Sequence, residues 1–131
     1  MKSIIPEIYV KNCKEALEFY KGVFGGEVTN VQMTDGKEMF KGIVGKVLHS
    51  ELHVNSACVL YFVDIFEGEK VEDSTHFVLE MDSKDEIDRV FEALKKDGSV
   101  KFELQKTFWG AYHAVVTDVY GNTWGLNYTE R

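Results

Sequence analysis

Apolar residues recur along the chain with two different spacings, which predict two helices and several short strands. Ala16, Phe19, Tyr20 and Val23 are three or four positions apart, which is typical of an amphipathic helix. Asn12 with Glu15 three residues later predicts the N-cap of the first helix, and Ser83 with Glu86 predicts that of the second by a capping box. The helices are expected over residues 12–24 and 83–96, and the strands over residues 4–10, 27–33, 46–54, 57–65, 75–81, 100–104, 111–117 and 123–128.

These elements follow the order βαβββ twice, at an offset near 71 residues. The helix positions Ala16, Phe19, Tyr20 and Val23 correspond to Ile87, Val90, Phe91 and Leu94. One unit of this kind cannot cover its own sheet, so two are expected to pair. We therefore predict an α+β fold in which two tandem βαβββ modules form a curved mixed sheet around a concave cavity, with the helices outside. We expect a single domain over residues 1–131, with module one at 1–66, a polar linker at 67–74 and module two at 75–131.

The charge of the chain excludes several classes of partner. Its 131 residues carry a net charge of −7, so phosphates of nucleic acids and anionic membranes would be repelled. No run of about 20 apolar residues is present to span a bilayer. Two cysteines form no disulfide framework and suit a reducing compartment. A cytoplasmic protein without nucleic-acid or membrane partners is expected.

Three segments carry a resemblance to a known superfamily. They are residues 6–28 (PEIYVKNCKEALEFYKGVFGGEV), 47–52 (VLHSEL) and 91–128, which contains FWG followed by D-x-x-G-x-x-W. The chain resembles the vicinal oxygen chelate superfamily, which holds glyoxalase I, bleomycin-resistance proteins and extradiol dioxygenases, and within it the PhnB-like branch. The resemblance implies a paired βαβββ fold, a homodimer, a small-molecule ligand and often a metal at four inward-facing positions.

At most of the four positions where the superfamily binds its metal, this chain lacks a metal-binding residue. They fall at Ile5, within residues 59–62, at His76 and at Gly125, and Asp64 lies just beyond the second position. Only His76 matches. Because a divalent metal normally needs three or more protein ligands, the standard site is expected to be absent.

Candidate polar chemistry lies on one predicted strand. His49, Glu51 and His53 alternate, so their side chains point to one face. Three interpretations stay open: a solvated strand face, a site that orients a polar ligand, or a displaced metal or proton-transfer site with His49, His53 and His76 as candidate metal ligands. Glu51 and Glu7 are the candidate catalytic carboxylates.

A second inward carboxylate follows from the repeat. The set His76, Val78 and Glu80 corresponds to Ile5, Glu7 and Tyr9, so Glu7 and Glu80 are expected to be quasi-equivalent inward carboxylates. Burial beside aromatic residues would raise the pKa of such a carboxyl group, as a general base requires.

Aromatic side chains are the candidates for a ligand-binding wall. Tyr9, Trp109, Tyr112 and Trp124, with His49, would bind the ligand. Core and cross-strand packing is the other interpretation. His113 lies on the opposite strand face from Tyr112, and no role is predicted for it.

Two functions follow. The first is a metal-free binding or sequestration protein, for which the acidic residues favour a cationic ligand. The alternative is a metal-dependent lyase or isomerase, or a dioxygenase-like enzyme, with a displaced metal site at His49, Glu51, His53 or His76.

Overall fold

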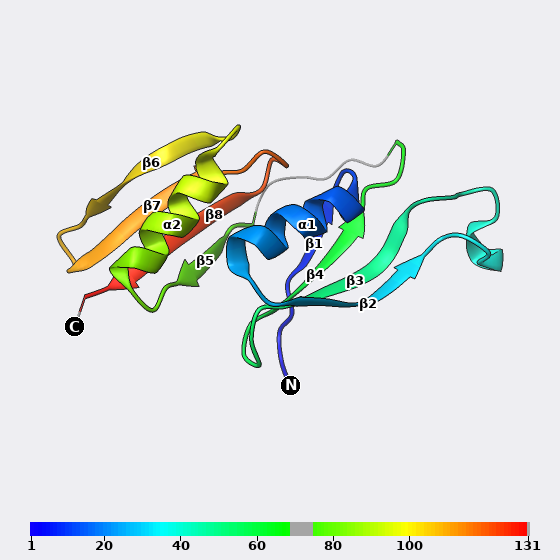
Figure 1. Ribbon diagram of the computed structural model, residues 1–131, viewed down its shortest axis with the longest axis horizontal. Coiled ribbons are helices and arrows are strands. Elements are labelled where there is room, and N and C mark those ends of the chain that lie inside the picture. Colours follow the sequence, from blue (N-terminus) through cyan, green and yellow to red (C-terminus); the bar gives the residue numbers. More distant parts are fainter. Residues whose placement is uncertain (69–74, 131) are drawn as a thin grey trace. The chain divides into compact units, whose positions relative to one another are not determined.

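The computed structural model describes residues 1–68 and 75–130 (Figure 1). Most of the predicted linker, residues 69–74, therefore lies outside the described residues. The chain divides into two compact units, residues 1–71 and 72–131, and each has its own four-stranded sheet and its own α-helix. Within the described residues, no helix is long and apolar enough to cross a membrane.

The first unit has the element order βαβββ. Its elements are β1 (Glu7–Val10), α1 (Cys13–Phe24), β2 (Glu27–Met33), the short 3-10 helix η1 (Glu38–Phe40), β3 (Val47–His53) and β4 (Val59–Asp64). The strand order is β1-β4-β3-β2. β1 pairs with β4 in parallel, and the other pairs are antiparallel, so the sheet is mixed.

The second unit repeats this arrangement. Its elements are β5 (Phe77–Glu80), α2 (Lys84–Lys95), β6 (Ser99–Lys106), β7 (Ala111–Thr117) and β8 (Thr123–Thr129). The order β5-β8-β7-β6 and the parallel β5–β8 pair match the first unit. The predicted α+β fold with two βαβββ modules is confirmed, including the bounds of β2 and β7.

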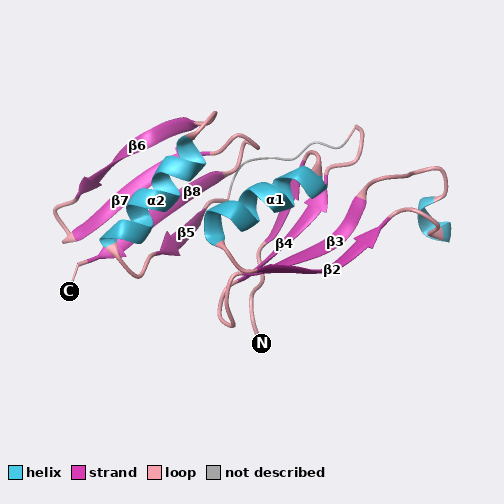
Figure 2. Ribbon diagram, in the orientation of Figure 1, coloured by secondary structure: helices cyan, strands magenta, loops and turns pink. Residues whose placement is uncertain are grey.

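Each helix covers one face of its sheet (Figure 2). The side chains of every strand are thereby divided into two sets, one under the helix and one on the other face. α1 packs against β3 and β4, where Tyr20 stacks on Phe62 with 4.7 Å between ring centroids. α2 packs against β7 and β8 and buries Ile87 and Leu94 fully. Because strand side chains alternate, the residues between these core positions lie on the face away from the helix.

The start of α1 is held by a residue distant in sequence rather than by its predicted cap. Asn12 adopts the left-handed conformation, with φ of 53°, and makes no side-chain cap. The buried carboxylate of Asp64 instead accepts a hydrogen bond from the Cys13 amide at 2.9 Å and one from the Val47 amide at 2.7 Å. Asp64 therefore ties the helix to β3. Ser83 caps α2 as predicted, because its Oγ accepts from the Glu86 amide at 3.1 Å. The Glu86 carboxylate accepts from the Asp82 amide at 2.8 Å, one residue before the position that a capping box requires.

Both modules need a glycine where the chain leaves the helix. A Cβ atom on Gly26 would lie 2.2 Å from the carbonyl oxygen of His53, and one on Gly98 would lie 2.2 Å from that of Thr117. Both contacts are with backbone, which cannot swing away. These glycines let β2 and β6 start directly beside the ends of β3 and β7.

We expect Gly98→Ala to lower the free energy of unfolding by about 2 kcal/mol or more, because the new methyl group would force the two strands apart. Urea unfolding measures the effect. Gly22→Ala is the matched control: it lies in α1 with no atom within 4 Å of the added Cβ. That change should be neutral or stabilise the protein by up to about 1 kcal/mol through helix propensity. A Gly98→Ala protein as stable as the unmodified chain would contradict this account of the repeat.

Candidate functional site

A row of polar and aromatic residues crosses the first sheet on the face away from α1. The register pairs Glu7 with Tyr61, Tyr61 with Glu51 and Glu51 with Thr29. Paired residues on neighbouring strands point to the same face, so Tyr61 lies between two carboxylates. Tyr9, two residues after Glu7, lies on this face and is 40% exposed.

Glu51 is the centre of a hydrogen-bonded cluster on this face. Its Oε2 atom accepts from His49 Nε2 at 2.7 Å and from Asn30 Nδ2 at 2.8 Å. Its Oε1 atom accepts from His53 Nε2 at 2.8 Å. The His49 ring in turn packs edge-on against Tyr61, with 4.6 Å between centroids. The structure thus brings together His49, Glu51 and His53 and adds Asn30 and Tyr61 to them.

A β-bulge in β2 delivers Asn30 to this cluster. The β2–β3 register shifts between Thr29 and Gln32, and Asn30 has φ of 51°. Asparagine tolerates this left-handed conformation better than most residues, and the bulge turns its side chain toward Glu51. Gln32 Nε2 then donates to Asn30 Oδ1 at 2.8 Å, which fixes the amide orientation. No spacing in the sequence predicts this bulge.

These hydrogen bonds set the charge of Glu51 and the tautomers of its partners. The bond from His49, then those from Asn30 and His53, lower the pKa of Glu51 from 4.5 to about 2. An ionised carboxylate only accepts hydrogen bonds, so both imidazoles donate from Nε2. Their other ring nitrogen, Nδ1, takes no part in these bonds to Glu51. Glu51 is therefore a fixed anion of low basicity, whereas a general base at neutral pH requires a pKa near 7.

His49, Glu51 and His53 lie close together, but their side chains are not arranged to hold a metal ion. The two imidazoles approach Glu51 from opposite sides along β3, and each gives its Nε2 atom to a carboxylate oxygen. Across residues 1–68 and 75–130, no group of three or more His, Cys, Asp or Glu side chains is arranged to hold a metal ion.

The donor set at the four superfamily positions does not fit a metal either. Ile5 carries no donor atom, and residues 59–62 contribute a single donor side chain, the Tyr61 phenol. Gly125 has no side chain, and a Cβ placed there would lie 3.2 Å from Val78. Asp64 faces α1 and is engaged by two backbone amides. His76 is the one of these positions whose residue matches the superfamily pattern.

The predicted aromatic residues do not lie on one face of one sheet: Tyr9 belongs to the first sheet, and Trp124 and Tyr112 lie under α2 in the second. Trp124 is 1% exposed, pairs with Val116 in the core and donates its indole N–H to Asp118 at 2.8 Å. Tyr112 lies on the α2 side, where the Lys84 ammonium is 4.9 Å from its ring centroid. Their placement favours the packing interpretation for both. Trp109, in the turn before β7, is 54% exposed.

The repeat reveals a further residue, His113, for which the sequence predicts no role. His49 pairs with Gln32, and His113 pairs with Gln105 at the equivalent place in the second sheet. His113 therefore lies on the face away from α2. A histidine at the third position of both β3 and β7 was the available signal.

The register agrees with the expected correspondence of the first strands of the two modules. Glu7 pairs with Tyr61, which pairs with Glu51, and in module two Val78 pairs with Gly125, which pairs with Val115. Val78 thus takes the place of Glu7, and Glu80 takes the place of Tyr9. Glu7 and Glu80 therefore lie on the exposed face of their own sheets, in neighbouring rows.

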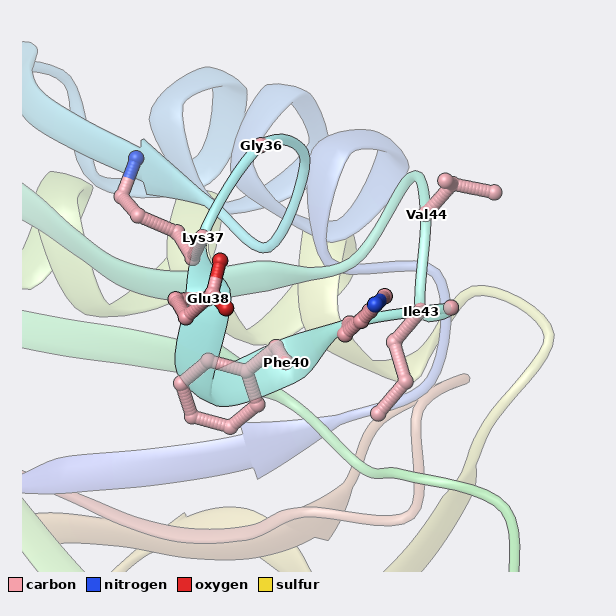
Figure 3. Close-up of a pocket in the computed structure, with 8 residues that line it drawn as sticks. Gly36, Lys37, Glu38, Phe40, Ile43 and Val44 are labelled. Atoms are coloured by element: carbon pink, nitrogen blue, oxygen red, sulfur yellow. The ribbon is translucent and has the colours of Figure 1, made fainter.

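A surface hollow of about 220 Å³ lies in the connection between β2 and β3 (Figure 3). Residues 36–38 and 40–44 line it, including Lys37, Phe40 and Ile43. None of the predicted site residues takes part. The hollow is thus distinct from the Glu51 cluster.

Comparisons with known proteins agree with this architecture. Protein PA1353 from Pseudomonas aeruginosa is 28% identical, with a TM-score of 0.87 over 100% of both chains. The PhnB protein from Bacillus cereus is 21% identical, with a TM-score of 0.80 over 98% of this chain and 100% of that one. A glyoxalase/bleomycin resistance protein/dioxygenase family enzyme from Burkholderia phytofirmans is 17% identical, with a TM-score of 0.66 over 96% and 97%. At these identities the last two show the fold alone.

No curated protein matches the chain in sequence. The family model does, over residues 4–126, which include both helices and seven complete strands. With the two βαβββ modules observed in the structure, this match shows that the chain belongs to the Glyoxalase/Bleomycin resistance protein/Dioxygenase superfamily.

Proposed function

We propose that the chain is a small-molecule-binding protein that takes a cationic ligand on the face of the first sheet away from α1, without a metal. The observation that carries this proposal is the row of Glu7, Tyr61 and Glu51 on three neighbouring strands. It places an aromatic ring between two carboxylates. This combination attracts cations through charge and through the face of the ring.

The dimensions of the row suit a small molecule. Neighbouring strands lie about 4.8 Å apart, so the strands that carry Glu7 and Glu51 are separated by about 10 Å. Glu7 is exposed at the edge strand, and Tyr9 beside it is 40% exposed. A ligand with one positive group and a flat body would contact the ring of Tyr61 while its charge lies near Glu7.

Glu51 contributes a constant negative charge to this site. Its pKa of about 2 keeps it ionised throughout the physiological range. Its side chain is 16% exposed and accepts hydrogen bonds from three donors. Glu51 therefore attracts a cation by its electrostatic potential rather than by direct contact, and it holds His49 against Tyr61. Glu7, at the exposed edge of the sheet, is the carboxylate that a ligand would contact directly.

The resemblance to the superfamily extends this proposal to the assembly. We propose a cytoplasmic homodimer, as the family implies. Sedimentation at several protein concentrations tests the dimer independently of the ligand.

Acid–base catalysis by His49 is the second candidate function, and one observation favours it. Because Glu51 accepts from Nε2, the neutral imidazole carries its lone pair on Nδ1, where it can accept a proton from a substrate. Glu51→Gln should then abolish turnover of a dicarbonyl or thiol-adduct substrate with little change in melting temperature. A substrate screen without turnover would count against this function and leave the binding proposal intact.

We expect phenyltrimethylammonium to bind more tightly than its neutral isostere tert-butylbenzene, and to raise the melting temperature with increasing concentration. Glu7→Gln and Tyr61→Leu should each weaken binding of the cation about fivefold, equivalent to ~1 kcal/mol. Isothermal titration calorimetry measures both effects.

Glu18→Gln is the matched control for this experiment. It removes the same charge from an exposed position on α1, on the other side of the sheet. Its effect should be well below that of Glu7→Gln. Equal losses in the two variants, or equal affinity for the charged and neutral probes, would contradict the proposal.

Glu51 should remain ionised at pH 3.5 in a carboxyl carbon-13 NMR titration. Its folded-state pKa is lowered, so ionised Glu51 stabilises the fold above pH 4.5, and this contribution is lost as the pH falls through about 2. His49→Ala should raise the pKa most, because the bond from His49 is the largest cause of the shift. Asn30→Gly, which keeps the left-handed backbone, should raise it less. A Glu51 pKa of 4.5 or higher in the unmodified protein would contradict the hydrogen-bonded cluster around this carboxylate.

A further inference from the structure

The second module has a polar row of its own on the face away from α2. The register pairs Glu80 with Asn127, Asn127 with His113 and His113 with Gln105, across all four strands of the sheet. This row does not correspond to the row of Glu7, Tyr61 and Glu51 on which the cation proposal rests. In module one, the positions equivalent to Glu80 and His113 are Tyr9 and His49.

Hydrogen bonds along this row orient the imidazole of His113. Asn127 Nδ2 donates to Glu80 Oε1 at 3.0 Å, and the Thr129 amide and hydroxyl donate to the same carboxylate at 3.3 Å. The amide nitrogen of Asn127 is thereby turned toward Glu80, so its oxygen faces His113 Nδ1 at 3.3 Å. An amide oxygen only accepts, hence His113 donates from Nδ1 and carries its lone pair on Nε2 when neutral.

Two exposed aromatic rings contact this imidazole. The centroid of Phe102 is 5.7 Å from that of His113, and the centroid of Trp109 is 5.8 Å from it. Phe102 is 38% exposed and Trp109 is 54% exposed, and Val78 on the same face is 65% exposed. Large apolar side chains gathered around one oriented polar atom are typical of a ligand site rather than of a solvated surface.

We propose that His113, Trp109 and Phe102 form a second binding site, which takes small planar aromatic molecules that carry one hydrogen-bond donor, with phenols as the chemical class. The ligand ring packs against Trp109 and Phe102, and its hydroxyl group donates to His113 Nε2. Asn127 and Glu80 are positioning residues, which keep this nitrogen in the accepting form.

The first test compares 4-ethylphenol with 4-ethylanisole, in which a methyl group caps the oxygen and removes the donor. Binding is followed by NMR shifts of the Trp109 indole N–H. The phenol should bind at least fivefold more tightly than the anisole. His113→Phe, which keeps an aromatic ring but removes Nε2, should reduce phenol affinity to that of the anisole.

Glu18→Gln, at an exposed position on α1, is the control for this experiment. It should leave phenol affinity unchanged. Equal binding of the two ligands, or unchanged phenol affinity in His113→Phe, would overturn the proposal.

The second test needs no variant. A nitrogen-15 spectrum of neutral His113 should show a protonated Nδ1 and an unprotonated Nε2. Asn127→Leu should shift the tautomer away from this state and weaken phenol binding, whereas a merely structural role for Asn127 would leave the tautomer unchanged. A protonated Nε2 in the neutral form of the unmodified protein would overturn the assignment.

Discussion

One helix covers only one face of each four-stranded sheet, and the chemistry of the chain follows from this constraint. The face under α1 is filled by core residues such as Phe62 and Leu52. Because successive side chains alternate, the positions between them must face away from the helix. In module one these positions hold two carboxylates and two histidines, so the alternation that builds the core also assembles the polar site.

The two modules share their backbone plan but have diverged on these faces. The row of Glu7, Tyr61 and Glu51 in module one is matched by Val78, Gly125 and Val115 in module two. Conversely, polar residues in module two occupy the neighbouring row, around His113. A duplicated scaffold with unlike rows can hold chemically different ligands, a cation in one module and an uncharged aromatic donor in the other.

The sequence predicted what depends on local pattern and missed what depends on tertiary contact. Periodicity placed both helices and put His49, Glu51 and His53 on one face, as observed. The cap of α1 was assigned to Asn12, whereas Asp64 provides it from the last residue of β4. The bulge at Asn30 has no local signature. In β7, both alternating sets contain aromatic or polar residues, so the pattern did not indicate which set lies under α2. The structure places Tyr112 under α2 and His113 on the other face.

The most direct test of the account is to locate a bound cation on the protein. Isotope-labelled protein with phenyltrimethylammonium should give nuclear Overhauser contacts between the methyl protons of the ligand and the ring protons of Tyr61 and Tyr9. Contacts to these rings, with none to the side chains of α1, would place the cation on the predicted face. Contacts confined to other surfaces, or none at saturating ligand, would contradict the central claim that the face away from α1 is a binding site.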